Sequence, residues 1–172
     1  MRYILLFLLV FFLILSKKNT KYKKVFIFFA ASTLIVFASL RGNTLNGKYS
    51  GNDYISYNKW FNNIDNIKLS LMNDIGFNIL MLVIKKITNS YQIFIIITSV
   101  LFVYSIFKFS IDNSKDYLIS IFIFIAFGIF ELGISAIRQW IAGSIFLLSF
   151  RYVKERKFRK ISIRNIDSFF IS

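Results

Sequence analysis

The stretch YQIFIIITSVLFVYSIFKF, residues 91–109, decides the class of fold that we expect. It is apolar over almost the ~20 residues that an α-helix needs to cross a bilayer. Tyr91 and Lys108 stand near its two ends, where side chains of mixed character reach the membrane interface. The sequence therefore predicts a transmembrane helix here.

The composition of the whole chain is that of a membrane protein. Of its 172 residues, 56% are hydrophobic and 19% are aromatic. Soluble domains average ~45–50% apolar residues by a broader count that includes glycine. The apolar runs do not alternate with polar residues, as the strands of a membrane barrel do. We therefore expect an all-α fold, a polytopic transmembrane helical bundle of about five spans with one interfacial or re-entrant helix.

Four other apolar runs predict spans near residues 2–16, 25–40, 117–132 and 134–150. The first two are short, and flanking Lys and Tyr side chains can lengthen them. The first run also fits a signal peptide, although Ser16-Lys17-Lys18 follows it instead of a small-residue cleavage site. Residues 76–84 are too few to cross and form the interfacial or re-entrant helix. A single membrane domain, 1–160, then precedes a polar tail, 161–172.

The charges set the expected topology. Eleven of the 22 basic residues lie in segments 17–24 and 151–160, each directly after an apolar run. The positive-inside rule places both in the cytoplasm if residues 76–84 do not cross, with the N-terminus and the loop 41–75 outside. We expect no nucleic-acid partner, because this distribution explains the net charge of +14. Four charged residues then lie at or near the external face: Arg41, Asp53, Glu131 and Arg138.

The loop 41–75 is the long polar interruption of the chain, and it begins RGNTLNGKYSGNDYISYNKWF at residues 41–61. Four of its apolar residues recur at helical spacing: Tyr54, Tyr57, Phe61 and Ile64. Ser50 or Asn52 can cap this helix, with Asp53 in its first turn. The aromatic face suits a helix that lies on the bilayer surface.

Arg138 is the sharpest signal of a functional site. It stands in an apolar segment, where a cation costs at least ~2.5–3.5 kcal/mol at mid-membrane and less near an interface. In a functional interpretation it binds phosphate or pyrophosphate in an external cavity through paired hydrogen bonds. In a structural one it pairs with Glu131, ~10 Å away along a straight helix, which requires a break such as Gly133 allows. The residues alone leave both interpretations open.

The other candidate residues also have two interpretations each. Asp53 is a general base, an acceptor for a substrate hydroxyl, or only a favourable charge at a helix start. Arg41 is a functional cation or an interfacial anchor. The loop aromatics either stack on sugar rings or form an interfacial belt: Tyr49, Tyr54, Tyr57, Trp60 and Phe61.

The sequence offers nothing for cofactor chemistry. It has no Cys, His or Pro, which removes thiol nucleophiles, imidazole bases and the usual zinc or copper ligands. The motifs GxxxxGK[ST], GxGxxG, HExxH and GxSxG do not occur, so a nucleotide-driven enzyme is unsupported. We therefore expect no metal and no other cofactor.

Three different short segments follow one another in a characteristic order. Arg41 at the end of a span precedes GNDYISY at 51–57, DIGFN follows at 74–78, and SAIRQWIA at 135–142 leads through an apolar run to RYVKERK at 151–157. Their order and spacing resemble the EpsG family of Wzy-like bacterial exopolysaccharide polymerases. Each motif is weak alone, and together with the spans they cover about residues 1–160.

The resemblance implies a multi-pass glycosyltransferase of the bacterial cytoplasmic membrane in exopolysaccharide or capsule biosynthesis. Such enzymes join undecaprenyl-pyrophosphate-linked oligosaccharide repeats at the outer face, where an acceptor hydroxyl displaces the lipid pyrophosphate. By this resemblance Arg138 and Asp53 are catalytic, and four residues bind substrate: Arg41, Tyr54, Tyr57 and Gln139. Membrane lipid and other polysaccharide export proteins are the expected partners.

The sequence also departs from the family pattern. Family members usually continue through more spans with a His-containing segment, whereas this chain has no His and reads ISIRNIDSFF at 161–170. We therefore expect an N-terminal half that is inactive alone as a polymerase. Two alternatives stay open. One is non-enzymatic: a membrane subunit that binds lipid-linked glycan or a partner transporter, or an inert remnant. The other is half of a small transporter, with Gly133 and Arg138 at a broken helix.

Overall fold

The computed structural model describes residues 2–40, 53–66 and 74–154. All regular secondary structure in these residues is helical, which confirms the all-α prediction. The elements are α1 (Arg2–Lys18), α2 (Lys23–Ser39), α3 (Tyr54–Asn63), the 3₁₀ turn η1 (Ile64–Asn66), α4 (Ile75–Ile87), α5 (Tyr91–Asn113), α6 (Tyr117–Ala126), α7 (Ile129–Ser135) and α8 (Ile137–Lys154).

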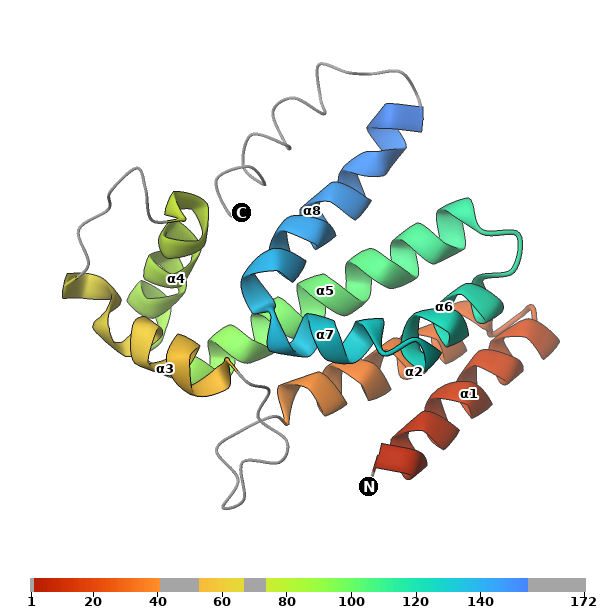
Figure 1. The fold of residues 1–172 in the computed structure, drawn as a ribbon. Helices are drawn as coiled ribbons and strands as arrows, with labels where there is room; N and C mark the ends of the chain where they lie inside the picture. The colour runs from red at the N-terminus through yellow and green to blue at the C-terminus, as the bar shows by residue number, and fades with distance from the viewer. Residues whose placement is uncertain (1, 41–52, 67–73, 155–172) are drawn as a thin grey trace.

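Helix α5 lies at the centre of the bundle (Figure 1). Its 23 residues extend ~34 Å, enough to cross a bilayer. Within the described ranges, α5 alone is long and apolar enough to span, or α5 and one further span if α6 and α7 count as one broken helix bent by 60°. Because α1 and α2 have 17 residues each, the expectation of five spans stays a prediction.

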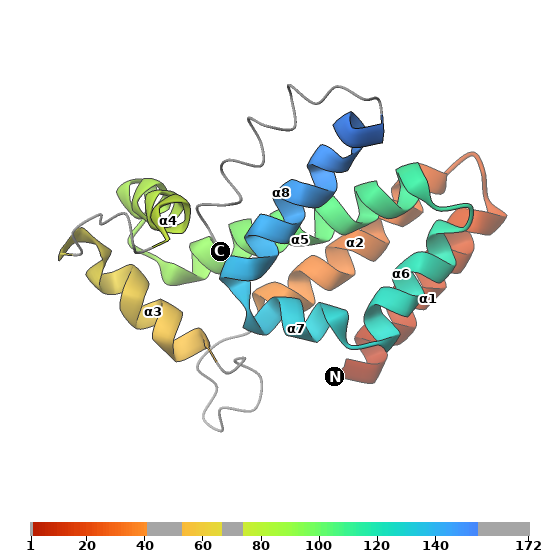
Figure 2. The same ribbon diagram turned by 45° about the horizontal axis from the view of Figure 1, so that its top comes forward.

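Helix α5 runs antiparallel to α2 and parallel to α8. Gln92 at the start of α5 donates a hydrogen bond to the backbone carbonyl of Ser39 at the end of α2, so these two helices are antiparallel. Helix α8 runs beside α5 in the same direction, and the rings of Phe109 and Phe150 meet near their ends at 5.3 Å. Figure 2 shows the same arrangement from a second side.

This arrangement gathers the described basic residues of the two clusters at one end of α5. Asp112, near the end of α5, lines one cavity with Lys23 and another with Arg151. Helices α3 and α4 lie at the opposite end, where α5 begins (Figure 1). The structure thus separates these basic residues from the polar loop region, as the charge rule requires of a topology with both basic segments on one side.

Two apolar clusters form the core. One joins α3, α4 and the first turns of α5 and α8, and includes Phe61, Phe77 and Phe94. The other joins α1, α2, α6, α7 and the later part of α5, and includes Phe102 and Phe130. Because α5 contributes to both, it connects the α3–α4 end of the protein to the rest of the bundle.

The region 117–135 differs from the prediction of an unbroken span. Helix α6 ends at Ala126, and α7 begins after Gly128, whose φ of +72° is a left-handed conformation that glycine adopts without strain. The structural interpretation of Arg138 required a break that Gly133 could allow. Gly133 instead lies inside α7, and the helix is interrupted at Ala136. Gly133 is buried against the ring of Phe102, so its missing side chain serves close packing.

The helix predicted over residues 54–64 is present as α3 and η1. Its aromatic face packs inside the protein, since the Tyr54 ring lies 5.2 Å from Tyr91 and the Phe61 ring 5.6 Å from Phe94. The expectation that this face lies on the bilayer surface is therefore wrong. Asp53 is the N-cap residue, not a first-turn residue, and the proposed caps Ser50 and Asn52 lie outside the described residues.

Helix α4 is longer than the apolar run that predicted it. Its 13 residues extend ~20 Å, too short for a span on its own. The helix continues through Lys85, whose ammonium group binds the Asp65 carboxylate at 2.6 Å and the backbone carbonyl of Asn62 at 2.6 Å. These contacts fasten α4 to the end of α3.

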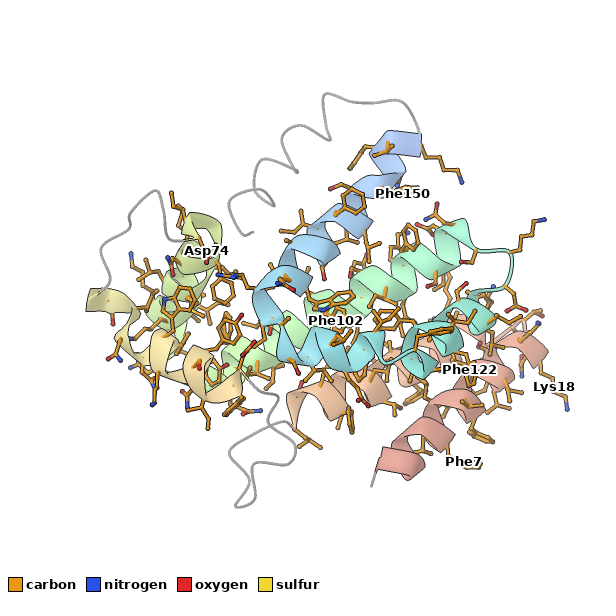
Figure 3. The ribbon with its side chains drawn as sticks, in the orientation of Figure 1. Phe7, Lys18, Asp74, Phe102, Phe122 and Phe150 are labelled. Atoms are coloured by element: carbon orange, nitrogen blue, oxygen red, sulfur yellow. The ribbon has the colours of Figure 1, made fainter. Side chains whose placement is uncertain are left out.

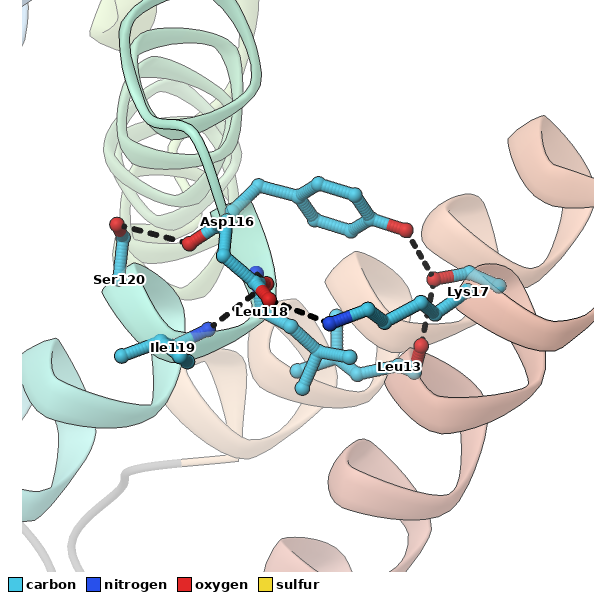
Figure 4. A network of polar contacts seen from close by, with 8 residues as sticks. Leu13, Lys17, Asp116, Leu118, Ile119 and Ser120 are labelled. Carbon is cyan, nitrogen blue, oxygen red and sulfur yellow. Dashed lines mark hydrogen bonds and ion pairs between the residues drawn. The ribbon is translucent and has the colours of Figure 1, made fainter.

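A polar contact connects α1 to the start of α6 (Figure 4). The Lys17 ammonium group lies 2.5 Å from the Asp116 carboxylate, which also caps α6 by accepting hydrogen bonds from the backbone of Leu118 and Ile119. Beside it, the hydroxyls of Ser16 and Tyr117 are 2.8 Å apart. The hydrogen bond from Lys17 is the main reason that the pKa of Asp116 is lowered.

Acid should weaken this contact. Because the pKa of Asp116 is lowered from 3.8 in the folded chain, the unfolded chain binds the proton more tightly. The resulting stability is present above the unfolded pKa and is lost as the pH falls through the folded one. We expect that, on acidification from neutral pH to below pH 3.8, the Asp116→Asn variant loses less stability than the parent. Thermal unfolding followed by circular dichroism in detergent measures this loss. An equal loss in both proteins contradicts this assignment.

Candidate functional site

An ion pair between Arg138 and Asp74 forms the centre of the candidate site. The guanidinium Nη1 of Arg138, in the first turn of α8, donates to Oδ2 of Asp74, the N-cap residue of α4. The Arg138 side chain is 32% exposed and the Asp74 side chain 17%. Figure 3 shows Asp74 on the side of α4 that faces α8. The pair is thus half-buried, but solvent still reaches it.

The local backbone places both charges at helix starts. An acidic residue is favourable at the N-terminus of α4, whereas a cation at the N-terminus of α8 opposes the helix dipole. Asp74 also has a φ of +32°, a left-handed conformation that Asp tolerates better than most residues. Asp74 therefore supplies the charge that makes Arg138 tolerable in its position.

Tyr57 lies beside the ion pair. Its hydroxyl oxygen accepts a hydrogen bond from the backbone N–H of Arg138, and the pKa of Tyr57 is raised. Burial is the largest cause, the hydrogen bond and charge of Arg138 act in the opposite direction, and the carboxylates of Asp53 and Asp74 add to the rise. Tyr57 therefore carries a neutral phenol at physiological pH, able to donate a hydrogen bond.

Aromatic packing fixes Tyr57 in place. Its ring stacks on Trp60 at 6.2 Å and meets the edge of Phe77 at 5.5 Å. Trp60 in turn meets Phe77 at 5.4 Å. Aromatic pairs in such geometries are worth ~0.5–1.5 kcal/mol beyond their buried area. These three rings from α3 and α4 form one aromatic cluster that holds Tyr57 beside Arg138.

Two buried donors at this site have no acceptor among the described residues. They are Nε of Arg138 and the indole Nε1 of Trp60. A buried polar group without a hydrogen bond costs free energy, so these donors favour a ligand rich in oxygen acceptors. In the described ranges no group of three or more acidic, His or Cys residues could hold a metal ion.

The structure brings together some of the residues that the sequence singled out. Arg138 and Tyr57 share the site, and exposed Asp53 is near enough for its charge to act on Tyr57. Tyr54 is only 8% exposed and packs on Tyr91, away from any open surface. Gln139 is exposed next to Arg138 in α8. Arg41 and Tyr49 lie outside the described residues.

The structural alternative that paired Arg138 with Glu131 is wrong. Arg138 binds Asp74, which is 64 residues away in the chain. Asp74 was visible in the sequence only as the first residue of DIGFN, and Trp60 only as one loop aromatic among five. A contact between α4 and α8 leaves no signal in the periodicity of either segment, so sequence reasoning missed this partner.

Comparison with known proteins identifies the chain at the level of a family. A model of the EpsG family matches residues 33–166, which include Asp53, Tyr57, Asp74 and Arg138. The chain belongs to the EpsG family. The resemblance seen in the three sequence segments is thereby confirmed. No curated protein and no solved structure matches the chain.

Membership of EpsG, a family of membrane polymerases, supports a role in polysaccharide biosynthesis at a membrane. The apolar helix α5 agrees with that setting. The match begins within α2, so it leaves α1 outside and includes the whole ion-pair site of this EpsG protein.

Proposed function

We propose that this EpsG-family protein acts in a Wzy-like polysaccharide polymerase at the outer face of the bacterial cytoplasmic membrane. Its substrates are undecaprenyl-pyrophosphate-linked oligosaccharide repeats, and its product is an exopolysaccharide or capsular polysaccharide. The observation that carries the proposal is Arg138, a half-buried cation with a buried donor, Nε, that no described residue uses. Such a group suits a pyrophosphate.

The main requirement of the reaction is stabilisation of the charge on the leaving group, and not a cofactor. A hydroxyl oxygen of the acceptor glycan forms a bond to the anomeric carbon of the donor, and the bond from that carbon to the pyrophosphate oxygen breaks. The pyrophosphate gains negative charge as it leaves, and the guanidinium of Arg138 stabilises that charge. The leaving group is already activated, so no nucleotide site is required.

The remaining residues position the two substrates. Asp53 is an exposed carboxylate near Tyr57, and in our proposal it accepts a hydrogen bond from the attacking hydroxyl or takes its proton. Tyr57, held neutral, is a donor to the sugar or the pyrophosphate. Gln139 follows Arg138 on α8 and is exposed, so its amide supplies a further contact. Arg41 remains part of the proposal as a second cation, from the sequence alone.

Orientation also supports the proposal. Arg138 and the α3–α4 region lie at the end of α5 that is opposite to Lys17, Lys23 and Arg151. If the basic end is cytoplasmic, as the positive-inside rule requires, the ion-pair site opens to the outer face. Lipid-linked repeats are joined on that side by the proposed reaction.

Altering the chromosomal coding sequence in place tests this function, because everything else at the locus stays intact. Deletion should abolish long-chain polymer and cause the lipid-linked repeat unit to accumulate. Arg138→Lys should lower polymer output about tenfold, since Lys is a point charge that cannot form paired hydrogen bonds. Arg151→Lys, at the other end of α8, is the matched control and should leave output unchanged.

The readouts separate the alternatives. Gel analysis of polymer length and mass spectrometry of extracted lipid-linked repeats are both needed. Unchanged polymer and unchanged lipid-linked repeats after deletion contradict a polymerase role altogether. Normal polymer in Arg138→Lys cells together with loss in deleted cells contradicts the assigned site but not the function, and favours a non-catalytic subunit.

A further inference from the structure

An apolar groove runs between α2 and α5, away from the ion-pair site. Its volume is about 600 Å³, within the ~300–1,000 Å³ that ligand pockets usually have. Three lysines lie at one end, Lys23 and Lys24 from α2 and Lys108 from α5. The remaining lining is mostly hydrocarbon. We call this feature the α2–α5 groove.

The groove has the length of one membrane leaflet. Along α2 it is lined from Lys23 to Ile35, and along antiparallel α5 from Val100 to Asp112. Each stretch covers twelve residue steps, or ~18 Å of helix. Half of the ~30 Å hydrocarbon core of a bilayer is ~15 Å. A lipid acyl chain that starts at the lysines therefore extends along the groove for about the depth of its own leaflet.

Small residues on α2 leave this space. Ala31 and Ser32 line the groove midway along α2, and neither side chain is large enough to close the gap to α5. The large apolar side chains around them are uncovered, since Phe28 is 67% exposed and Val100 43%. Contact of such a surface with water costs free energy, whereas contact with hydrocarbon does not.

The charged end favours an anion. Lys24 is exposed, Lys23 lies with its ammonium group 4.7 Å from the centre of the Tyr117 ring, and Lys108 binds Asp112 at 3.0 Å. The four groups that line this end, three ammonium ions and one carboxylate, leave it positive. A headgroup phosphate at this end can contact the exposed Lys24, and Lys23 and Lys108 line the same end of the groove.

We propose that the α2–α5 groove binds one anionic phospholipid, with its phosphate at Lys23, Lys24 and Lys108 and an acyl chain along Ala31 and Ile35. This site lies at the basic end of α5, so it is separate from the polymerase site and independent of the proposed function. It accounts for a strongly apolar groove whose cations gather at one end only.

The full chain, purified in mild detergent, tests this by native mass spectrometry. The probes are phosphatidylglycerol and phosphatidylcholine with identical acyl chains. Phosphatidylglycerol should be retained about tenfold better, and Lys23→Gln/Lys24→Gln should remove most of that preference, because each Lys near an anionic headgroup contributes measurably to binding. The control Lys18→Gln/Lys21→Gln removes the same charge from exposed lysines that do not line the groove, and should change little.

A second variant tests the groove itself. Ala31→Trp should reduce retention of both lipids, since the indole occupies the space of the acyl chain. Three results overturn the proposal: equal retention of the two lipids by the parent chain, an equal effect of the Lys18/Lys21 pair, or a second copy of the chain bound in place of lipid. Circular dichroism checks that each variant is folded. If Ala31→Trp does not fold, the lysine variants still test the proposal.

Discussion

Exchanging the two charges of the ion pair, Asp74→Arg with Arg138→Asp, should keep the fold and lower polymer output about 100-fold. The double variant again has opposite charges at the two positions. It places a carboxylate, however, where the leaving pyrophosphate needs a cation, and removal of one such stabilising group typically costs 10²–10³ in rate. Arg at position 74 must adopt a left-handed backbone, which costs about 1 kcal/mol.

The single variant Asp74→Ala provides the comparison for stability. It leaves Arg138 half-buried without its partner, and we expect a loss of roughly 1–3 kcal/mol, less than for a fully buried pair because solvent reaches both side chains. Thermal unfolding in detergent should show that the double variant regains most of this loss. If the double variant also regains polymer output in cells, the ion pair is purely structural and the catalytic assignment of Arg138 fails.

Gly133→Ala should destabilise the bundle by about 2 kcal/mol, although Ala favours helix. A Cβ at this position would overlap the ring of Phe102. That ring cannot turn away easily, because it stacks on Phe130 at 5.9 Å and meets the edge of Trp140 at 4.9 Å. Overpacking of this kind costs roughly 3 kcal/mol, against a gain of about 1 kcal/mol from helix propensity.

Gly143 is the matched control on the next helix. A Cβ there would come no nearer than 3.7 Å, to the Trp140 ring, which is ordinary contact. Gly143→Ala should therefore stabilise by about 0.5–1 kcal/mol through propensity alone. Denaturant unfolding in mixed micelles measures both variants. Equal behaviour of the two contradicts close packing of α7 on α5 at Gly133.

Local signals made some elements predictable. The apolar run 91–109 lies within α5, and the spacing of Tyr54, Tyr57, Phe61 and Ile64 predicted α3 and η1. Both rest on the period of the helix, a property of neighbours in sequence. The same signals did not reveal that the aromatic face of α3 would pack on α5, because an aromatic face suits a membrane surface and a protein interior equally.

The candidate site was predictable only in part. Arg138 was conspicuous because a cation in an apolar run has to be compensated, yet its nearest candidate partner in sequence, Glu131, was the wrong one. The helix is interrupted at Ala136 and not at Gly133. Helix α8 therefore starts in a new direction, which brings Arg138 to α4. Asp74 becomes its partner through this turn of the backbone.

By itself the sequence determined that the chain is helical and apolar, that its basic residues cluster after two apolar runs, and that it resembles the EpsG family. Composition, period and motif spacing are local properties, and folding leaves them unchanged. Only the tertiary structure decided which acid meets Arg138, which aromatic rings hold Tyr57, and that small residues on α2 leave a groove against α5. Each of these depends on how helices distant in sequence pack, and the free energy of that packing comes from contacts that no single segment contains.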